Sequence, residues 1–403
     1  MATRNEVIYQ SVALYSSSVT GAVDYPGVVK AEAKQLQRVQ DISWGGEVTR
    51  TEINCMGKLA SLSREIIEEP TVNLSFSYYL ANAFNESGCL GMNVQGMSDA
   101  PTNLIANILA DDDGANERNY YVATVPQGYD ADDYPSHGAD LTTDGAVGFV
   151  GIGNAFMSEY SVNLAVGDIP TANVSFDAAN LTFATGNSYE QGAVWGIQNP
   201  AIDRNGTLPD VQFKGAVTLP AYDSDPGDST ENLTVTALRP GDITLSFGTT
   251  GLAAGGVVLD GNSDAISAGG TRQQAHIQSV TITVPMSRTP LNTLGNPFAF
   301  ARKLDVPINT TLAVSANVGD LVTGSLVDLV CTDDPGRDIT ITLGSKCGGV
   351  SNMIYEIKGA QLDSQNMSMG MGESETVELQ FTAQVGGKND QVNGVFLSGS
   401  LPL

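Results

Sequence analysis

Apolar and polar residues alternate along two stretches of the chain, at residues 62–78 and 298–315. In the second stretch, every second residue from Phe298 to Val314 is mostly apolar, and the residues between them are mostly small, polar or charged. A period of two is typical of a strand with one buried face. The stretch is longer than an ordinary strand, and Pro307 interrupts it. We therefore expect either one bent strand or two strands that break near Pro307.

An arginine stands in the apolar row of each stretch, Arg64 in the first and Arg302 in the second. Burial of a guanidinium group without a partner is costly, so each arginine should meet a carboxylate or backbone carbonyl groups. The pattern favours a buried ion pair at each position, and the alternative is a contact between subunits.

The segment Arg50–Arg64 recurs as Arg288–Arg302, at a constant offset of 238 positions from 50 to 288. Apolar residues also recur in this segment, with Ile53 and Met56 matched by Leu291 and Leu294. The identical positions of the two segments are Arg50, Thr51, Asn54, Gly57 and Arg64 in the first and Arg288, Thr289, Asn292, Gly295 and Arg302 in the second.

Two further blocks recur in the same order. Residues 104–114 match 326–336, and residues 167–176 match 372–381, so the offset falls from 238 to 222 and then to 205. Three ordered blocks with a shrinking offset predict a duplicated domain whose first copy has longer loops. The second block is an apolar run followed by acidic residues and a glycine, which predicts a short helix in each copy.

These patterns predict a mostly β protein with two tandem copies of a β-sandwich or barrel domain, each with one short helix. The expected helices are Leu104–Ala110 and Leu326–Thr332. The segment between the copies is rich in Pro, Gly, Asp and Asn, which is typical of either a linker or a small surface hairpin. The expected boundaries are an N-terminal arm at 1–35, the first copy at 36–185, the intervening segment at 186–235 and the second copy at 236–403.

The composition is that of an ordinary globular chain, with 41% hydrophobic residues despite 44 glycines. No run of eighteen apolar residues occurs, so no membrane span is predicted. The first ten residues, MATRNEVIYQ, lack the apolar segment of a secretory signal. We therefore expect folding in the cytoplasm and four reduced thiols, at Cys55, Cys89, Cys331 and Cys347.

The formal charge of −26, from 45 acidic and 19 basic residues, argues against a protein that holds nucleic acid through its phosphates. Two interpretations of this charge remain open. It keeps a protein soluble, and it could also line a surface past which a polyanion moves without binding.

No set of catalytic residues stands out in the chain. His137 and His276 are isolated from any nucleophile motif, and no cysteine pair has CxxC spacing. The glycine-rich segment Gly148–Phe156 lacks the Lys-Ser/Thr of a phosphate loop, which favours a strand. We therefore predict a protein that is not an enzyme and that has no catalytic residue and no cofactor.

Acidic clusters suggest calcium as an alternative to solvated loops. The segment from Asp223 to Glu231 comes closest to a calcium loop, with Asp225 and Asp228 between them, but Pro226 interrupts the ligand spacing. We predict no metal site, and a calcium-binding acidic loop remains open.

Several segments resemble structural proteins of tailed-bacteriophage virions, and most closely the major tail (tail tube) protein. These are QLQRVQDISWGGEVTRTEINCMGKLA and EEPTVNLSFSYYLAN in the first copy and IQSVTITVPMSRTPLNTLGNPFAFAR in the second. The resemblance covers most of the chain except the termini and the intervening segment. It implies a β-sandwich or barrel unit with one helix, six of which close into a ring around a channel for DNA.

The resemblance also implies partners and a location. A duplicated chain would form rings of three chains, with six chains per ring as the alternative, and the rings would stack through loops and the N-terminal arm. The partners would be further copies of this chain and other tail proteins (tape measure, terminator and tip), with genomic DNA only in transit and no membrane. The location would be the virion tail, assembled in the cytoplasm of the host bacterium. The candidate assembly residues are Arg50, Asn54, Gly57, Arg64, Arg288, Asn292, Gly295 and Arg302.

Two other functions remain open. One is another virion component, such as a capsid decoration or baseplate protein. The other is a β-sandwich enzyme or carbohydrate-binding module, which would need exposed aromatic clusters or paired carboxylates, whereas Trp44 and Trp195 are the only tryptophans. If the chain forms a channel, we expect a negative wall with few lysines or arginines. The alternative places the acids outside, in loops such as Asp130–Asp140 and Asp223–Asp228.

Overall fold

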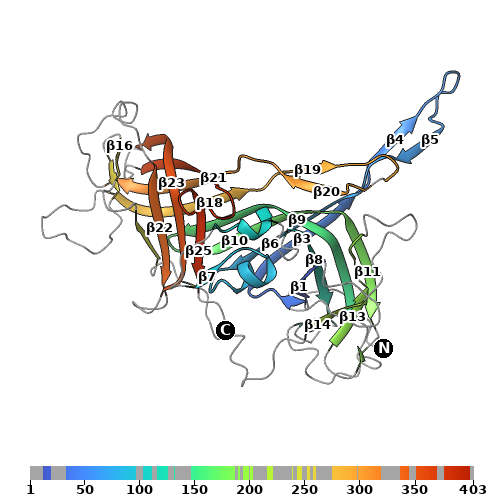
Figure 1. The fold of residues 1–403 in the computed structure, drawn as a ribbon, viewed down its shortest axis with the longest axis horizontal. Coiled ribbons are helices and arrows are strands. Elements are labelled where there is room, and N and C mark those ends of the chain that lie inside the picture. Colours follow the sequence, from blue (N-terminus) through green and yellow to red (C-terminus); the bar gives the residue numbers. More distant parts are fainter. Residues whose placement is uncertain are drawn as a thin grey trace, which may run out of the picture.

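A computed structural model describes most of the chain, and it confirms a mostly β protein (Figure 1). The described residues are 12–19, 33–96, 103–110, 116–125, 131, 147–186, 189–190, 194–198, 200–202, 216–220, 238, 243–246, 252–254, 257–259, 275–296, 298–318, 336–344, 351–369 and 376–399. Among them, no helix is long and apolar enough to cross a bilayer.

One antiparallel sheet runs through the whole molecule, and we call it the long sheet. Its neighbouring strands are hydrogen-bonded to each other. From one edge to the other, the strands are β3 (Val39–Glu47), β6 (Thr71–Tyr79), β10 (Thr171–Ala178), β9 (Val147–Ala165), β18 (Ala275–Pro285), β21 (Asn309–Val318), β24 (Thr376–Gln384) and β23 (Ser351–Ser368).

The described residues 12–202 form the first half of the molecule and the described residues 238–399 form the second half. In each half, a second layer covers one face of the long sheet. The layer is continuous with the long sheet, because the first parts of β9 and β23 belong to it and their last parts belong to the long sheet. Its strands are β1 (Val12–Ser18), β8 (Arg118–Thr124) and β11 (Asn180–Gly186) beside β9, and β15 (Ile243–Ser246), β22 (Arg337–Gly344) and β25 (Gly394–Gly399) beside β23.

Short elements complete these layers. They are β2 (Lys34–Gln35), β7 (Gln95–Gly96), a π-helical turn η3 (Asn85–Cys89) and the helix α1 (Ala106–Ala110). Among the described strands, two small sheets are not hydrogen-bonded to these layers, one of β12 (Tyr189–Glu190), β13 (Val194–Gln198) and β14 (Ala216–Pro220) and one of β16 (Leu252–Ala254) and β17 (Val257–Leu259). The three-stranded sheet falls in the predicted intervening segment, so this segment contains strands.

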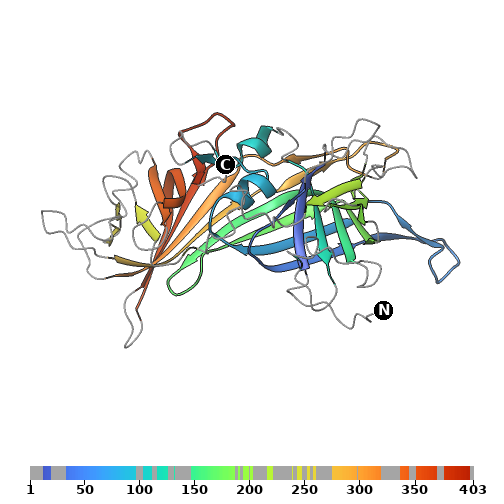
Figure 2. The same ribbon diagram turned by 90° about the horizontal axis from the view of Figure 1, so that it is seen from below.

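Two β-hairpins extend from the long sheet. The first is β4 (Arg50–Ile53) with β5 (Ser63–Ile66), and the second is β19 (Arg288–Leu291) with β20 (Ala301–Leu304). Both point toward the same end of the molecule. The second hairpin lies along the first half, whereas the first hairpin extends beyond the body, as both ribbon views show (Figures 1 and 2).

The core lies between the long sheet and the second layer. Strand β6 alternates between exposed and buried residues, and its buried Phe76 stacks on Phe176 of β10, with ring centroids 5.7 Å apart. Tyr120 of β8 closes this group from the second layer, 4.7 Å from the ring of Phe176. The period-two pattern therefore produces two faces, because one side of each strand packs on the second layer and the other meets solvent.

The same pairings occur in the two halves of the molecule, with the same register. Trp44 of β3 is opposite Leu74 of β6, and Ile282 of β18 is opposite Leu312 of β21, both 238 positions later. Further along the sheet, Phe76 is opposite Val174, and Val314 is opposite Leu379. Val314 comes 238 positions after Phe76, and Leu379 comes 205 positions after Val174, which are two of the offsets between the repeated blocks. The register of strand pairing shifts just after Arg118 in β8, and it shifts in the same way just after Arg337 in β22.

Several sequence predictions can be compared with this fold. The break near Pro307 is confirmed, because β20 ends at Leu304 and β21 begins at Asn309. The segment Gly148–Phe156 is a strand, as expected, within β9. Helix α1 lies within the first predicted helix, and the second, Leu326–Thr332, lies outside the described residues.

The expected N-terminal arm needs a correction. Its residues Val12–Ser18 form β1, which pairs with β8 along its whole length and is mostly buried. The physical reason is that β8 has one edge on β9 and offers main-chain groups to β1 on the other. These residues therefore belong to the first half of the molecule.

Candidate functional site: an acidic sheet face and two hairpins

The long sheet has one face that no described layer covers. Its residues alternate with the buried ones in every strand, and most of them are Ser, Thr, Asn or Gln, for example Asn73, Ser175 and Gln380. Part of this face in the second half is hollowed, with a volume of about 310 Å³ lined by residues such as Thr281, Ser315 and Glu378. We call this surface the open face.

Among the strands that the structure describes, the open face carries acidic side chains and neither lysine nor arginine. None of the strands of the long sheet contains a lysine or arginine in its open-face positions, although Lys358 occurs in the part of β23 that belongs to the second layer. The acidic side chains come from both halves of the molecule: Asp41, Glu47, Glu159 and Asp177 in the first, and Asp363 and Glu378 in the second. This face is therefore negative and densely hydroxylated.

The two hairpins have the same local geometry, which explains why their residues recur. Gly57 and Gly295 have φ values of 86° and 92°, in the left-handed region where glycine meets no steric cost. The amide of Leu62 donates to the carbonyl of Ile53 at 2.7 Å, and the amide of Phe300 donates to the carbonyl of Leu291 at 2.9 Å. The repeated glycines therefore fix two identical turns. Asn54 and Asn292 are exposed beside these turns.

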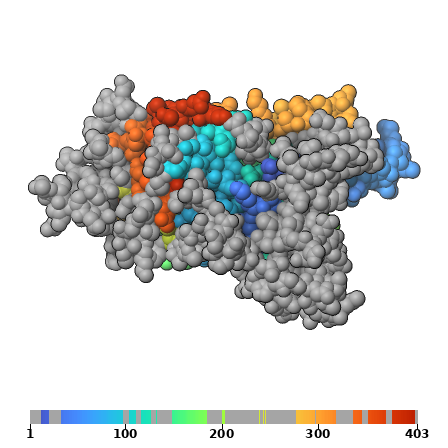
Figure 3. All heavy atoms as spheres, turned by 60° about the horizontal axis from the view of Figure 1, so that its bottom comes forward, coloured from blue at the N-terminus to red at the C-terminus, as the bar shows by residue number. Residues whose placement is uncertain are grey.

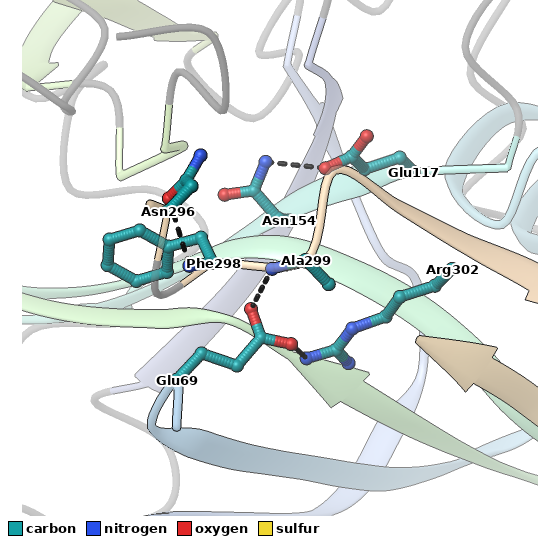
Figure 4. A network of polar contacts seen from close by, with 7 residues as sticks. All are labelled: Glu69, Glu117, Asn154, Asn296, Phe298, Ala299 and Arg302. Atoms are coloured by element: carbon teal, nitrogen blue, oxygen red, sulfur yellow. Dashed lines mark hydrogen bonds and ion pairs between the residues drawn. The ribbon is translucent and has the colours of Figure 1, made fainter. Parts of the chain in front are cut away.

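The arginines of the second hairpin lie against the first half of the molecule. Nη2 of Arg302 is 2.7 Å from Oε1 of Glu69, and the two side chains are only 11% and 15% exposed. Figure 4 shows Glu69 also accepting a hydrogen bond from the backbone amide of Ala299, at 3.2 Å. The predicted ion pair is therefore present at Arg302, and it is largely buried.

Arg288 is also held by the first half. Its Nε donates to the carbonyl of Met157 at 3.3 Å, and its guanidinium carbon lies 5.2 Å from the ring centroid of Phe156. The guanidinium of Arg302 lies 5.5 Å from the same ring. The second hairpin is thus fixed to the first half by two cation–π contacts, one ion pair and backbone hydrogen bonds.

The prediction of a buried arginine is wrong for Arg64. Its side chain is 61% exposed, and its Nε lies 3.4 Å from Oε1 of Glu52, a neighbour on the same hairpin. Arg50, the equivalent of Arg288, is exposed as well. The reason is that no described element covers the first hairpin, so the periodic pattern continues into a segment with solvent on both sides.

Large apolar side chains are exposed at both hairpin tips. Met56, Leu59 and Leu294 are fully exposed, and Ile53, Leu62 and Leu291 are partly exposed. The first hairpin (blue) stands away from the body at one end of the molecule in Figure 3, whereas the second (orange) lies along the body. Contiguous exposed apolar residues usually mark a contact with another protein.

A buried carboxyl group lies beneath the contact between the two halves. Glu86 of η3 is fully buried, and its Oε1 accepts hydrogen bonds from the hydroxyls of Tyr78 at 2.7 Å and Tyr160 at 3.3 Å. The hydroxyl of Tyr160 lies 2.9 Å from that of Tyr355, which comes from the second half. Burial raises the pKa of Glu86 from its ordinary value of 4.5 to about 7, and the hydrogen bonds from Tyr78 and Tyr160 oppose this shift.

Other candidate groups from the sequence are not brought together. Within the part of the chain that the structure describes, no three His, Cys, Asp or Glu residues are grouped as a metal site would require. Cys55 is an exposed free thiol and Cys89 a buried one. His137, the calcium-like loop at 223–231, Cys331 and Cys347 lie outside the described residues.

Glu69, Phe156 and Glu86 were not predicted from the sequence. Glu69 stands in an ordinary acidic run, and its equivalent position 238 residues later is Pro307, so the repeat gives no signal for it. Phe156 has the same difficulty, because Gln361 takes its place in the second half.

No protein-family model and no curated protein matches this sequence.

Proposed function

We propose that this protein is a structural component of a tailed-bacteriophage tail tube, in which rings of the chain stack around a channel for DNA. The observation that carries the proposal is the open face of the long sheet, which is polar, acidic and free of lysine and arginine. The chain would act without a cofactor, and its place would be the virion tail, assembled in the host cytoplasm.

The open face suits the wall of a DNA channel. Each phosphate that a basic side chain neutralises adds affinity for DNA, so a basic wall would hold the genome. Acidic groups repel phosphates over roughly 8–10 Å at physiological salt. Most of the side chains between the acids are small hydroxyls and amides, which give bases no aromatic surface on which to stack. DNA would therefore pass with little friction.

We further propose that the chain holds two copies of one tube domain. The matching registers of β3–β6–β10–β9 and β18–β21–β24–β23 support this, since unrelated sheets have no reason to share both strand order and register. The equal turns at Gly57 and Gly295 add local support. A ring of six domains would then need three chains.

The hairpins suit contacts between chains. Their exposed tips carry Met56, Leu59 and Leu294. An assembly that covers these side chains removes their apolar surface from water. Rings would stack through the hairpins, and the same surfaces at the tube ends would meet other tail proteins.

Electron microscopy of the purified protein tests the proposal. We expect rings or stacked tubes with a central channel. DNA binding then tests the wall: the unmodified protein should retain no DNA, whereas the triple variant N73K/S175K/Q380K should retain it, with an affinity that falls steeply as salt is raised.

A matched variant, N73Q/S175T/Q380N, changes the same positions without adding charge and should behave like the unmodified protein. A chain that stays monomeric at high concentration would contradict the tube. Rings in which the lysine variant gains no affinity for DNA would show that the open face does not line the channel.

A further inference from the structure

The contact between the two halves of the chain is itself a strand pairing. β9 and β18 are antiparallel neighbours in the long sheet, with Thr281 opposite Asn163 and Ile282 opposite Val162. The amide of Met286, just after β18, donates to the carbonyl of Ser158 at 2.8 Å. This contact buries Ile282 and Met286 almost completely.

The strand equivalent to β18, β3, has no such neighbour among the residues that the structure describes. β3 pairs with β6 in the register in which β18 pairs with β21, and among the described strands nothing pairs with its other edge. Trp44 takes the position of Ile282 and is 37% exposed, and Val48 takes the position of Met286 and is 44% exposed. The edge of β3 thus exposes side chains at the positions where the side chains of β18 are buried.

The strand equivalent to β9 is also at an edge. β23 pairs with β24 in the register in which β9 pairs with β10, and the irregularity at Ser158 recurs at Asp363. Beyond this irregularity, β24 is on one side of β23, and no described strand is on the other. Two apolar side chains are exposed along this edge, Met367 at 39% and Met369 at 71%.

We infer that β3 of one chain pairs with β23 of a second copy, in the register of the β9–β18 contact inside the chain. Moving Thr281 back by 238 positions gives Ser43, and moving Asn163 forward by 205 positions gives Ser368. Ser43 therefore lies opposite Ser368 of the second copy, and Trp44 lies opposite its Met367. The inference deepens the proposed function, on which it rests, because it specifies the contact that would close the ring.

The side chains at this pairing are compatible on both faces. Trp44 and Met367 are on the core side of their strands, since they are opposite the buried Leu74 and Val377, so they would cover each other. Ser43 and Ser368 are on the open face, which would continue across the contact without a basic residue. An exposed edge with apolar residues is otherwise prone to unspecific pairing, which specific pairing prevents.

One chain cannot make this pairing with itself. β3 and the last part of β23 are at opposite ends of the long sheet (Figure 1). The contact joins two different surfaces, so repetition gives a closed ring when the rotation closes and an open filament when it does not. The occupant of the β3 edge is therefore a second copy of this chain.

The first hairpin then takes the place that the second hairpin has inside the chain. Arg288 donates to the carbonyl of Met157, whose counterpart in the second half is Leu362. Arg50 would accordingly reach the backbone of Leu362 in the second copy, beside the carboxylate of Asp363. The charges are opposite, which favours this contact.

Disulfide trapping tests the register. In the background C55S/C331S/C347S, we would introduce S43C and S368C together and oxidise mildly. Opposite residues in an antiparallel pair have Cα atoms about 4.5–5.5 Å apart, within the range that a disulfide spans. We expect most chains to appear as covalent dimers and trimers on a non-reducing gel.

Two matched variants serve as controls. T281C/N163C places the same chemistry in the β9–β18 contact and should consume its two thiols without linking chains. S43C/S364C displaces one thiol by four residues, about 13 Å along the strand, and should link less than a tenth as many chains.

The outcomes separate this inference from the proposed function. Rings or tubes in which S43C/S368C does not link, or in which S43C/S364C links equally well, overturn the register and leave the tube standing. Linked chains that form only open filaments without a channel support the pairing and contradict the tube. A protein that is monomeric by light scattering and does not link overturns both.

Discussion

β3 and β18 have equivalent places in the two halves of the molecule but different surroundings. β18 lies between β21 and β9, and its Ile282 is 1% exposed. Of the described strands, β6 alone pairs with β3, and Trp44 of β3 is 37% exposed. The hairpins that follow these strands differ in the same way. Arg302 is held by Glu69 of the other half, and Arg64 only by Glu52 of its own hairpin.

This difference teaches that a repeated sequence can have two environments in one chain. The second half places the edge of β18 and its hairpin against the first half. The first half offers the same surfaces to the outside. The exposed edge and hairpin thus define what a further copy would cover.

The largest expected effect comes from placing a charge in the two equivalent strands. I282D buries an unpaired carboxylate, which should cost more than about 4 kcal/mol and prevent folding. W44D should cost clearly less stability than I282D, since Trp44 is already 37% exposed, but under the inferred pairing it should abolish association. Urea unfolding and light scattering measure the two effects. A folded I282D variant would contradict the buried contact, and an associating W44D variant would contradict the role of the β3 edge.

The next effect depends on pH and on the carboxyl beneath the contact between the halves. The folded state raises the pKa of Glu86 from 4.5 to about 7, so the protonated group contributes stability that is complete below about pH 4.5 and is lost as the pH rises through 7. The loss amounts to roughly 3 kcal/mol. E86Q should therefore be more stable than the unmodified protein at pH 8 and similar to it at pH 4.5.

Urea unfolding at both pH values measures this difference, and E159Q, a change of an exposed carboxylate on the open face, is the control. An equal effect of E86Q at pH 4.5 and pH 8 would show that Glu86 does not titrate in this range.

A smaller effect separates the two ion pairs. E69Q leaves the charge of the largely buried Arg302 without its partner and should cost about 2 kcal/mol. E52Q removes the exposed partner of Arg64 and should cost less than about 0.5 kcal/mol. The free energies of unfolding of the two variants, measured in urea on the dissociated chain, test the comparison. Equal losses would mean that the second hairpin is no better anchored than the first.

The smallest effect on stability is expected at the hairpin tips. Met56 and Leu294 are both fully exposed, so M56S and L294S should each change the free energy of unfolding by less than about 0.5 kcal/mol. Under the proposed function, each should raise the protein concentration needed for assembly, as sedimentation would measure. A loss of stability above about 1 kcal/mol would show that a tip packs on the body.

The sequence by itself determined the strand class, an interruption at Pro307 as either a bend or a break, and the recurrence of Gly57 and Gly295. These features are local: alternation follows from the two-residue repeat of a strand, and proline and glycine act on their own backbone. The absence of lysine and arginine from the open face is also written in the sequence, although the position of that face is not.

The tertiary structure decided what lies beside each strand and hairpin. The alternation around Arg64 and Arg302 is the same, yet only Arg302 is buried, because only the second hairpin has another half of the chain to lie on. Strand edges pair through main-chain groups that every residue carries, so a sequence pattern shows which face of a strand is buried and leaves its neighbour open. For the same reason β1 joined β8, and Glu69, Phe156 and Glu86 became important only through residues far away in the chain.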